Sequence, residues 1–391
     1  IATVADKAGN SATATDTGMI DAVVTLTVNA PDGVSNDNTP YISGTSDAIG
    51  SNVNLVITDS KGATHTVTVP VTEEGTYAVD LSEQLPDGKY TVSATVSNST
   101  GKTATASDTG EIDTTAVITV EAPDLSNDNT PTLTGTTNDV EEGQTVTLTV
   151  TDSRGGSQVV TATVQADGSY QAEVPNALPD GRYSVEAVVS DKAGNRAEAR
   201  DDNNGKGNVI DTTAPIVNAP GHSVEEASSA AVKGFIQVSD KSPVTAITVA
   251  GKDVTSATAA HPVMIHTVRG TLIVTGYDAA SGKVTYRYVE GGKAADHSTG
   301  DNSVKDSFVV MVRDAAGNTA MDSLDIRITD TAPVAVHDTN SIKDTGMSVS
   351  GDVLSNDVLG ADTPVAVTVG NTNGQYGSLT LNANGQYTYT V

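Results

Sequence analysis

The sequence predicts an all-β protein made of tandem immunoglobulin-like β-sandwich domains arranged end to end as a rod. Three observations lead to this fold class: a long internal repeat, short alternating runs rich in Val and Thr, and the absence of a sustained 3.6-residue period. From Asp16 to Asp108, which open the phrases DTGMID and DTGEIDTT, is 92 residues. Turn phrases recur in register with this period: NDNTP at 36–40 and 127–131, and LPDG at 85–88 and 178–181.

The repeat divides the chain into five expected parts. They are residues 1–21 as the last strands of a preceding repeat, 22–113 (repeat 1), 114–212 (repeat 2), 213–332 (segment 3) and 333–391 (the C-terminal segment). Segment 3 is a divergent sandwich with longer loops, and the C-terminal segment has about half the length of a sandwich. Neither end of the chain looks like a natural terminus, so we expect an excised fragment.

Each repeat contains seven short runs, and seven strands are typical of an immunoglobulin-like sandwich. In repeat 1 they are 23–28, 39–45, 52–58, 65–71, 76–81, 89–96 and 102–107. Repeat 2 shows the same series, followed by an insert at 201–207. Tyr90 and Tyr183 follow the LPDG turn, where a buried ring whose hydroxyl returns to the backbone would form a tyrosine corner.

Composition narrows the partners. The chain has 21 Lys plus Arg against 49 Asp plus Glu, a net charge of −28, which argues against nucleic acid and anionic membrane surfaces and in favour of cations. No apolar run approaches the roughly 20 residues of a membrane span, so direct membrane insertion is not expected. With no cysteine in the chain, bound calcium is the expected substitute for disulfides in an extracellular protein.

Carboxylates gather at the joints between repeats. A hard divalent cation would neutralise them, and oxygen-only clusters suit calcium. The candidate ligands are Asp16, Asp21, Asp37, Asp87, Asp108, Asp113, Asp128, Asp180, Asp191, Asp211, Asp314 and Asp330, with Asp139, Glu141 and Glu142 nearby. Strand order predicts that Asp37, Asp87, Asp108 and Asp113 face Asp191 at one joint, and that Asp128, Asp180 and Asp211 face Asp314 at the next. The alternative is that these aspartates only form turns.

Two further metal sites are weaker hypotheses. One uses Asp296, His297, Asp301 and Asp306, for which a solvated loop is the simpler interpretation, and the other uses Asp352, Asn356, Asp357 and Asp362. Catalysis is not expected, because the six histidines are scattered and no nucleophile elbow, phosphate loop or paired-acid motif is present. For ligand binding, Tyr277, Tyr286 and Tyr288 are candidates, against the simpler interpretation that their rings face the core.

Several motifs together resemble the giant repeat adhesins of the RTX- and Bap-like kind that bacteria export by type I secretion. NDNTP, LPDG, DKAGN (191–195) and DTTAP (211–215) resemble their bacterial Ig-like repeats. GTLIVTGYDAASGKVTYRY (270–288) is similar to a repeat of type I secretion targets, and DVLSNDVLG (352–360) to a cadherin-like, VCBS-type repeat. The resemblance implies that Asp21, Asp113 and Asp211 ligate calcium, helped by acids in adjoining loops. Residues 113–117, DTTAV, lack the proline of the motif.

The resemblance also implies a function: a calcium-stabilised rod segment of a secreted or surface-anchored adhesin that attaches bacteria to host cells or surfaces, with roles in virulence and biofilm. The expected partners are neighbouring repeats and a host-cell or surface receptor, including a glycan receptor. Two alternatives remain open at this point. One is a carbohydrate- or peptide-binding module in segment 3, and the other is an accessory region of a secreted hydrolase.

Overall fold

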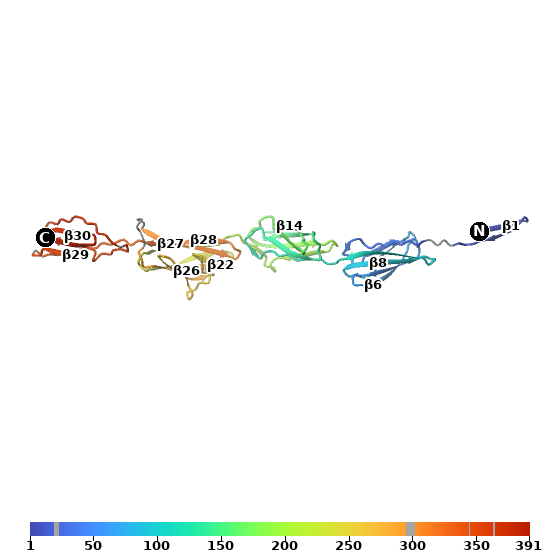
Figure 1. The fold of residues 1–391 in the computed structure, drawn as a ribbon, viewed down its shortest axis with the longest axis horizontal. Helices are drawn as coiled ribbons and strands as arrows, with labels where there is room; N and C mark the ends of the chain where they lie inside the picture. Colours follow the sequence, from blue (N-terminus) through green and yellow to red (C-terminus); the bar gives the residue numbers. More distant parts are fainter. Residues whose placement is uncertain (19–22, 295–301, 344, 363) are drawn as a thin grey trace. The chain divides into compact units, whose positions relative to one another are not determined.

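The computed structural model describes residues 1–18, 23–294, 302–343, 345–362 and 364–391 (Figure 1). Within these ranges the regular elements are all β-strands, which confirms the all-β prediction. The same ranges contain no helix of the length and hydropathy needed to cross a bilayer. The chain forms two compact units, Ile1–Asp124 with Thr130–Asn208, and Leu125–Asn129 with Val209–Val391.

The first unit begins with an isolated antiparallel hairpin, β1 (Ala2–Ala5) and β2 (Ser11–Ala14), around the DKAGN turn. Repeat 1 then forms two sheets. One has the order β3 (Val34–Ser35), β9 (Thr103–Ile112), β8 (Gly88–Ser97), β5 (Asn52–Thr58) and β6 (Thr64–Pro70), and the other pairs β4 (Tyr41–Thr45) with β7 (Thr76–Asp80). All of these pairs are antiparallel except β3 with β9.

The strand pattern of repeat 1 follows its alternating sequence. In β5, Val53, Leu55 and Ile57 are fully buried between more exposed neighbours, as the period of two requires. The expected strand at 23–28 is present only as isolated bridges, of Leu26 to Ser46 and nearby of Asn29 to Ser43. A side chain replaces part of its ladder, because the Asp47 carboxylate accepts the Thr25 N–H at 2.9 Å.

In repeat 1 a buried tyrosine links β7 to the segment at 23–28. The Tyr77 hydroxyl donates a hydrogen bond to the carbonyl oxygen of Thr27 at 2.5 Å, and burial raises the pKa of Tyr77 to about 12. Gly44 lies beneath the ring, where a Cβ atom would be only 2.2 Å from the Thr27 oxygen. Repeat 2 has the same arrangement of Tyr170, Gly135 and the Thr119 carbonyl. This tyrosine was not singled out by the sequence motifs.

Repeat 2 follows the plan of repeat 1. One sheet has the order β10 (Val117–Ile118), β12 (Thr132–Asn138) and β15 (Ser169–Glu173); in the other, β13 (Thr145–Asp152) lies between β14 (Ser157–Thr163) and β16 (Gly181–Ser190), and β17 (Arg196–Asp201) pairs with β16. The predicted insert separates β17 from β18 (Asn208–Ile210). Tyr183 is buried and its hydroxyl donates to the carbonyl oxygen of Pro123 at 3.0 Å, which confirms the tyrosine corner at this position.

The second unit contains segment 3 as two five-stranded sheets. One sheet has the order β19 (Ile216–Asn218), β21 (Ala231–Ser239), β26 (Lys283–Glu290), β25 (Gly270–Asp278) and β24 (Val263–His266). The other has the order β20 (His222–Glu225), β28 (Thr319–Thr329), β27 (Ser303–Asp314), β22 (Val244–Val249) and β23 (Lys252–Asp253). The sheets enclose one core, to which Tyr286, Tyr288 and Phe308 contribute. Two of the three candidate ligand-binding tyrosines, Tyr286 and Tyr288, are therefore core residues.

The same unit holds two smaller elements. β11 (Leu125–Ser126) pairs in parallel with β18. The C-terminal segment forms a three-stranded sheet in the order β29 (Ser348–Asp352), β31 (Gln386–Thr390) and β30 (Ser378–Leu381). A bridge between Val334 and Val358 fastens the start of this segment.

Candidate metal centres

A short turn with the sequence Asp-x-Ala-Gly-Asn positions one carboxylate in repeat 2 and one in segment 3. In repeat 2, the buried Asp191 carboxylate accepts the N–H groups of Gly194 at 2.7 Å and Asn195 at 2.8 Å. The Asn195 side-chain amide bonds the other Asp191 oxygen and also donates to the backbone carbonyl of Asp113, both at 2.7 Å. The turn thus fixes Asp191 beside residues 108–115 at the joint between repeats 1 and 2, which we call the first seam. This proximity of Asp191 to Asp113 was predicted.

The same turn recurs in segment 3 at 314–318. Asp314 is 1% exposed and accepts the N–H groups of Gly317 at 2.7 Å and Asn318 at 2.8 Å. Asn318 Nδ2 donates to Asp314 and to the backbone carbonyl of Asp211, both at 2.8 Å. The predicted proximity of Asp211 to Asp314 is therefore present in the structure.

Asp211, Asp240 and Asp314 form the more buried of two carboxylate groups, which we call the DDD centre. One oxygen from each residue lies within 4.8 Å of the other two. Asp211 is 6% exposed, and its carboxylate accepts hydrogen bonds from Thr213 N–H at 3.1 Å and from the Ser242 hydroxyl. All three members come from loops or strand ends of the second unit, so the fold assembles the centre from distant parts of the sequence.

Asp240 completes the DDD centre and was missed by sequence reasoning. Its Oδ1 atom accepts the Ser242 N–H at 3.3 Å, whereas its Oδ2 atom is buried and has no hydrogen-bond partner. A buried carboxylate oxygen without a donor is costly, so this atom needs a cationic ligand or water. A signal was available in the sequence, because SDK at 239–241 copies the first three letters of SDKAGN at 190–195.

Glu226, Asp330 and Asp362 form the second group, the EDD centre, with oxygens within 4.8 Å of one another. Glu226 is 2% exposed and accepts the Thr331 N–H at 3.4 Å, and the Thr331 hydroxyl accepts the Ala361 N–H at 3.0 Å. Oδ1 of Asp330 is buried without a hydrogen-bond partner, like Oδ2 of Asp240. Asp330 and Asp362 were predicted candidates, but in different sites, and Glu226 was not singled out.

The first seam is a looser acidic group. Burial raises the pKa of Asp113 above its ordinary value of 3.8, and the charges of Asp191, Asp87 and Asp139 raise it further. Asp87 is exposed and accepts both N–H and O–H bonds from Thr114, at 3.2 and 2.8 Å. Among the residues that the structure describes, this seam does not form a group of three oxygens as tight as the DDD or EDD centre.

The remaining predicted ligands lie elsewhere. Asp108 is within β9, and its Oδ2 atom accepts the Ala30 N–H at 2.9 Å, a bond that Asp201 repeats with Ala122 and Asp322 with Ala219. This recurring bond gives Asp108 a role inside its own repeat. The exposed residues Asp16, Asp37, Asp128 and Asp180 belong to neither three-carboxylate group, and Asp21 lies outside the described residues.

The two weaker hypotheses fare differently. Asp296, His297 and Asp301 lie outside the described residues, and Asp306 accepts hydroxyl bonds from Tyr288 at 2.6 Å and Thr267 at 2.5 Å inside the sandwich. In the other hypothesis, Asp352 at the end of β29 accepts the Leu354 N–H, and Asp357 accepts the N–H of the distant Val336. Of this set only Asp362 joins a three-carboxylate group.

The DDD centre concentrates negative charge. Coulomb's law at an effective dielectric of 20 gives about 3.5 kcal/mol for two unit charges 4.8 Å apart. Three ionised carboxylates within that distance therefore repel by on the order of 10 kcal/mol. In the described part of the chain, Asp211, Asp240 and Asp314 form no ion pair with Lys or Arg. Carboxylate and hydroxyl oxygens alone fit calcium better than the softer transition metals.

Comparison with known families accounts for the fold. Residues 27–114 and 119–204 match the model of the bacterial Ig-like domain, and residues 330–391 match that of the bacterial Ig domain. The chain contains bacterial Ig-like domains. They follow one another in tandem, which confirms that part of the predicted fold class, and the family match points to a structural rather than an enzymatic protein. No curated protein sequence matches this chain.

The Ig-like chain is also similar to repeats of solved bacterial adhesins. One is a tetra-tandem repeat in the extending region of a large adhesion protein, with 25% identity over 93% of this chain and 89% of that chain, at a TM-score of 0.28. A 1.5-MDa bacterial ice-binding adhesin is 18% identical over 78% of this chain and 96% of that chain, with a TM-score of 0.37. A Ca²⁺-stabilised adhesin with which an Antarctic bacterium binds ice is 24% identical over 84% of this chain and 79% of that chain, with a TM-score of 0.32.

Proposed function

We propose that this chain is a calcium-stiffened rod segment of a large bacterial adhesin. The observation that carries the proposal is that the DDD and EDD centres each combine three converging carboxylates with one buried oxygen that has no hydrogen-bond partner. Calcium uses six to eight oxygen ligands, so water would complete either centre. The bound ion would replace repulsion between the acids by attraction to a shared charge.

The position of the acids supports a mechanical role for the ion. Asp211 belongs to the segment that leads from repeat 2 into segment 3, and Asp330 belongs to the segment that leads into the C-terminal segment. An ion held by such a linker and by loops beside it restricts the linker, because bending would break metal–oxygen bonds. At the first seam, Asp113, Asp191, Asp87 and Asp139 are the candidate ligands in this proposal.

The wider setting follows from this role. In the proposal the protein leaves the cell by type I secretion and is displayed outside it, where calcium is abundant. Each repeat is then the partner of its neighbours, and a receptor on a host cell or another surface, or a glycan, is bound by the adhesin as a whole. The match to bacterial Ig-like domains and the likeness to adhesin repeats support this assignment.

Calorimetric titration of the intact chain with calcium tests the proposal. Sites of this extracellular type bind at about 10⁻⁴ to 10⁻³ M, so millimolar calcium should stabilise each site by about 1 to 2 kcal/mol. Asp211→Asn combined with Asp314→Asn should remove one class of sites. Asp167→Asn, in an exposed turn where that carboxylate accepts the Ser169 N–H at 3.0 Å, is the control and should bind as the parent does. Unchanged binding in the double variant would refute the assignment of the DDD centre.

A further inference from the structure

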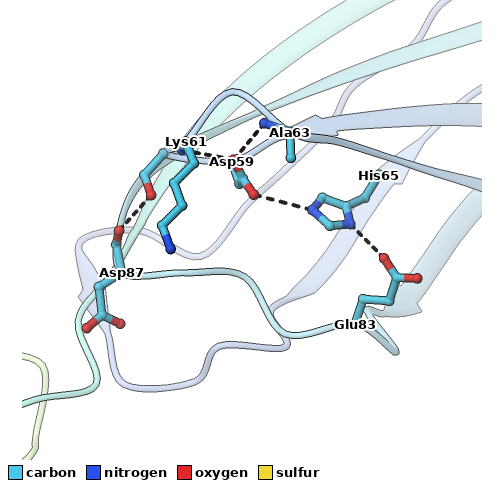
Figure 2. A network of polar contacts seen from close by, with 7 residues as sticks. Asp59, Lys61, Ala63, His65, Glu83 and Asp87 are labelled. Atoms are coloured by element: carbon cyan, nitrogen blue, oxygen red, sulfur yellow. Dashed lines mark hydrogen bonds and ion pairs between the residues drawn. The ribbon is translucent and has the colours of Figure 1, made fainter.

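A histidine in repeat 1 lies between two carboxylates from different loops (Figure 2). His65, in β6, places Nδ1 2.7 Å from Glu83 Oε2 and Nε2 3.5 Å from Asp59 Oδ2. Asp59 belongs to the turn between β5 and β6, and Glu83 to the loop between β7 and β8. The side chains of His65 and Asp59 are 21% and 6% exposed, whereas that of Glu83 is 73% exposed.

The two partners specify the protonation state of the ring. A carboxylate only accepts hydrogen bonds, and a neutral imidazole has one N–H. A neutral His65 would therefore turn a lone pair toward Asp59 or toward Glu83. The imidazolium form offers an N–H to both, and this matters most at Nε2, which is shielded from solvent and has no hydrogen-bond partner in the present geometry.

The charged groups around the ring favour the protonated form on balance. The hydrogen bond to Glu83 is the largest influence raising the pKa of His65, burial opposes it, and Asp59 adds to the rise. Asp59 remains an anion: burial would raise its pKa, but the N–H groups of Ala63 and Lys61, at 2.8 and 2.9 Å, and His65 together lower it. The Lys61 side chain lies on the other side of Asp59 from the ring (Figure 2).

We propose that His65, Asp59 and Glu83 form a pH-sensitive clasp that fastens the β7–β8 loop to the edge of the larger sheet of repeat 1. β6 is the edge strand of that sheet, and Glu83 is the loop residue that the clasp holds. The same loop is also held at Asp87, whose carbonyl oxygen accepts the Ser60 hydroxyl at 2.7 Å (Figure 2). Opening the clasp would release the loop at its Glu83 end.

Repeat 2 contains a neutral counterpart of the clasp. Gln158 occupies the position of His65, since Gln158 pairs with Val150 as His65 pairs with Ile57. Its side-chain amide donates to the Asn176 carbonyl at 2.9 Å and accepts the Asn176 N–H at 3.2 Å. Neither side chain titrates near neutral pH. The two repeats should therefore respond differently to acid although they share one fold.

The direction of the effect follows from linkage. Folding raises the pKa of His65 above its ordinary value of 6.5, so the clasp stabilises repeat 1 fully below pH 6.5. The stabilisation is lost as the pH rises through the folded-state pKa. Each unit of elevation multiplies the ratio of closed to open clasp by about tenfold on the acid side. Glu83 is mostly exposed, so salt should weaken the effect.

Hydrogen exchange on the intact chain tests the clasp. The opening equilibrium of β6 is compared with that of β14 between about pH 5.5 and 8, in chelator and after correction for intrinsic exchange. Opening of β6 should increase several-fold with pH relative to β14. His65→Gln combined with Glu83→Asn should abolish the difference. Gln158→His combined with Asn176→Glu should transfer the pH dependence to β14.

The outcomes are decisive in either direction. Parallel pH dependence of β6 and β14 in the parent chain would overturn the proposal, as would a dependence that survives in the His65→Gln and Glu83→Asn variant. If that variant does not fold, Glu83→Gln alone should reduce the pH dependence of β6, and an unreduced dependence would overturn the clasp. Because calcium is absent from these measurements, they stand apart from the test of the DDD centre.

Discussion

Replacing Asp240 by asparagine should stabilise segment 3 in chelator and remove most of the stabilisation that calcium adds. The substitution keeps the shape of the side chain and removes one of the three charges of the DDD centre. In chelator the parent carries unbalanced repulsion, so Asp240→Asn should be more stable than the parent. In calcium the substitution removes a ligand, so the variant should gain much less stability from calcium than the parent does.

The structure bounds the size of this change. Asp240 shares two of the three close pairs in the centre, and each pair contributes about 3.5 kcal/mol at 4.8 Å and a dielectric of 20. The repulsion that the substitution relieves is therefore at most about 7 kcal/mol. Because Asp240 is partly exposed and its side chain can move outward, we expect the variant to be more stable by about 1 to 2 kcal/mol in chelator. Calcium should stabilise the parent by about 1 to 2 kcal/mol that the variant does not gain, so the two chains should have similar stability in calcium.

Urea unfolding of the intact chain, with and without calcium, measures both effects. The transition to follow is that of segment 3, which hydrogen exchange or a reporter placed in its core can isolate from the other domains. Asp167→Asn is again the matched control and should change little in either condition. If the variant is no more stable than the parent in chelator, or if calcium stabilises both chains equally, the reasoning about charge in the DDD centre is refuted.

Three further predictions concern the domains themselves. Tyr183→Phe leaves the Pro123 carbonyl without this donor and should lower the free energy of unfolding of repeat 2 by about 1 to 3 kcal/mol in urea titrations, whereas a neutral result would count against the tyrosine corner. Leu55→Ala, at a fully buried site, should lower the free energy of unfolding of repeat 1 by about 2 to 5 kcal/mol in the same titrations. A smaller loss would indicate a loosely packed core. Because folding raises the pKa of Asp113 above 3.8, its contribution in chelator is most favourable below pH 3.8 and is lost as the pH rises through the raised value. Asp113→Asn should remove that part of the pH dependence, and identical profiles for parent and variant would contradict it.

The fold could be predicted because its signals are local. Alternation places Val53, Leu55 and Ile57 on one face of a strand, and turn phrases bound the runs on either side. The prediction of a continuous strand at 23–28 was wrong because the pairing of this segment depends on a distant side chain. The Asp47 carboxylate takes the place of a backbone acceptor for the Thr25 N–H. Periodicity carries no information about such a substitution.

The candidate ligands could be predicted where a turn or a repeated phrase marks them, as the phrase DTTAP marks Asp211. Asp191 and Asp314 were identified because the Asp-x-Ala-Gly-Asn turn fixes both the carboxylate and its contact with the seam. Asp240 and Glu226 were missed because they reach their centres through the packing of strands that are far apart in the sequence. Asp108 shows the reverse case, since its position in a repeated phrase reflects a recurring bond within the repeat.

A crystal structure of the chain grown with calcium tests the central claim most directly. The account predicts anomalous density for an ion about 2.3 to 2.6 Å from oxygens of Asp211, Asp240 and Asp314, with a second ion between Glu226, Asp330 and Asp362. Carboxylates turned toward solvent with no ion between them, in crystals grown at millimolar calcium, would contradict it.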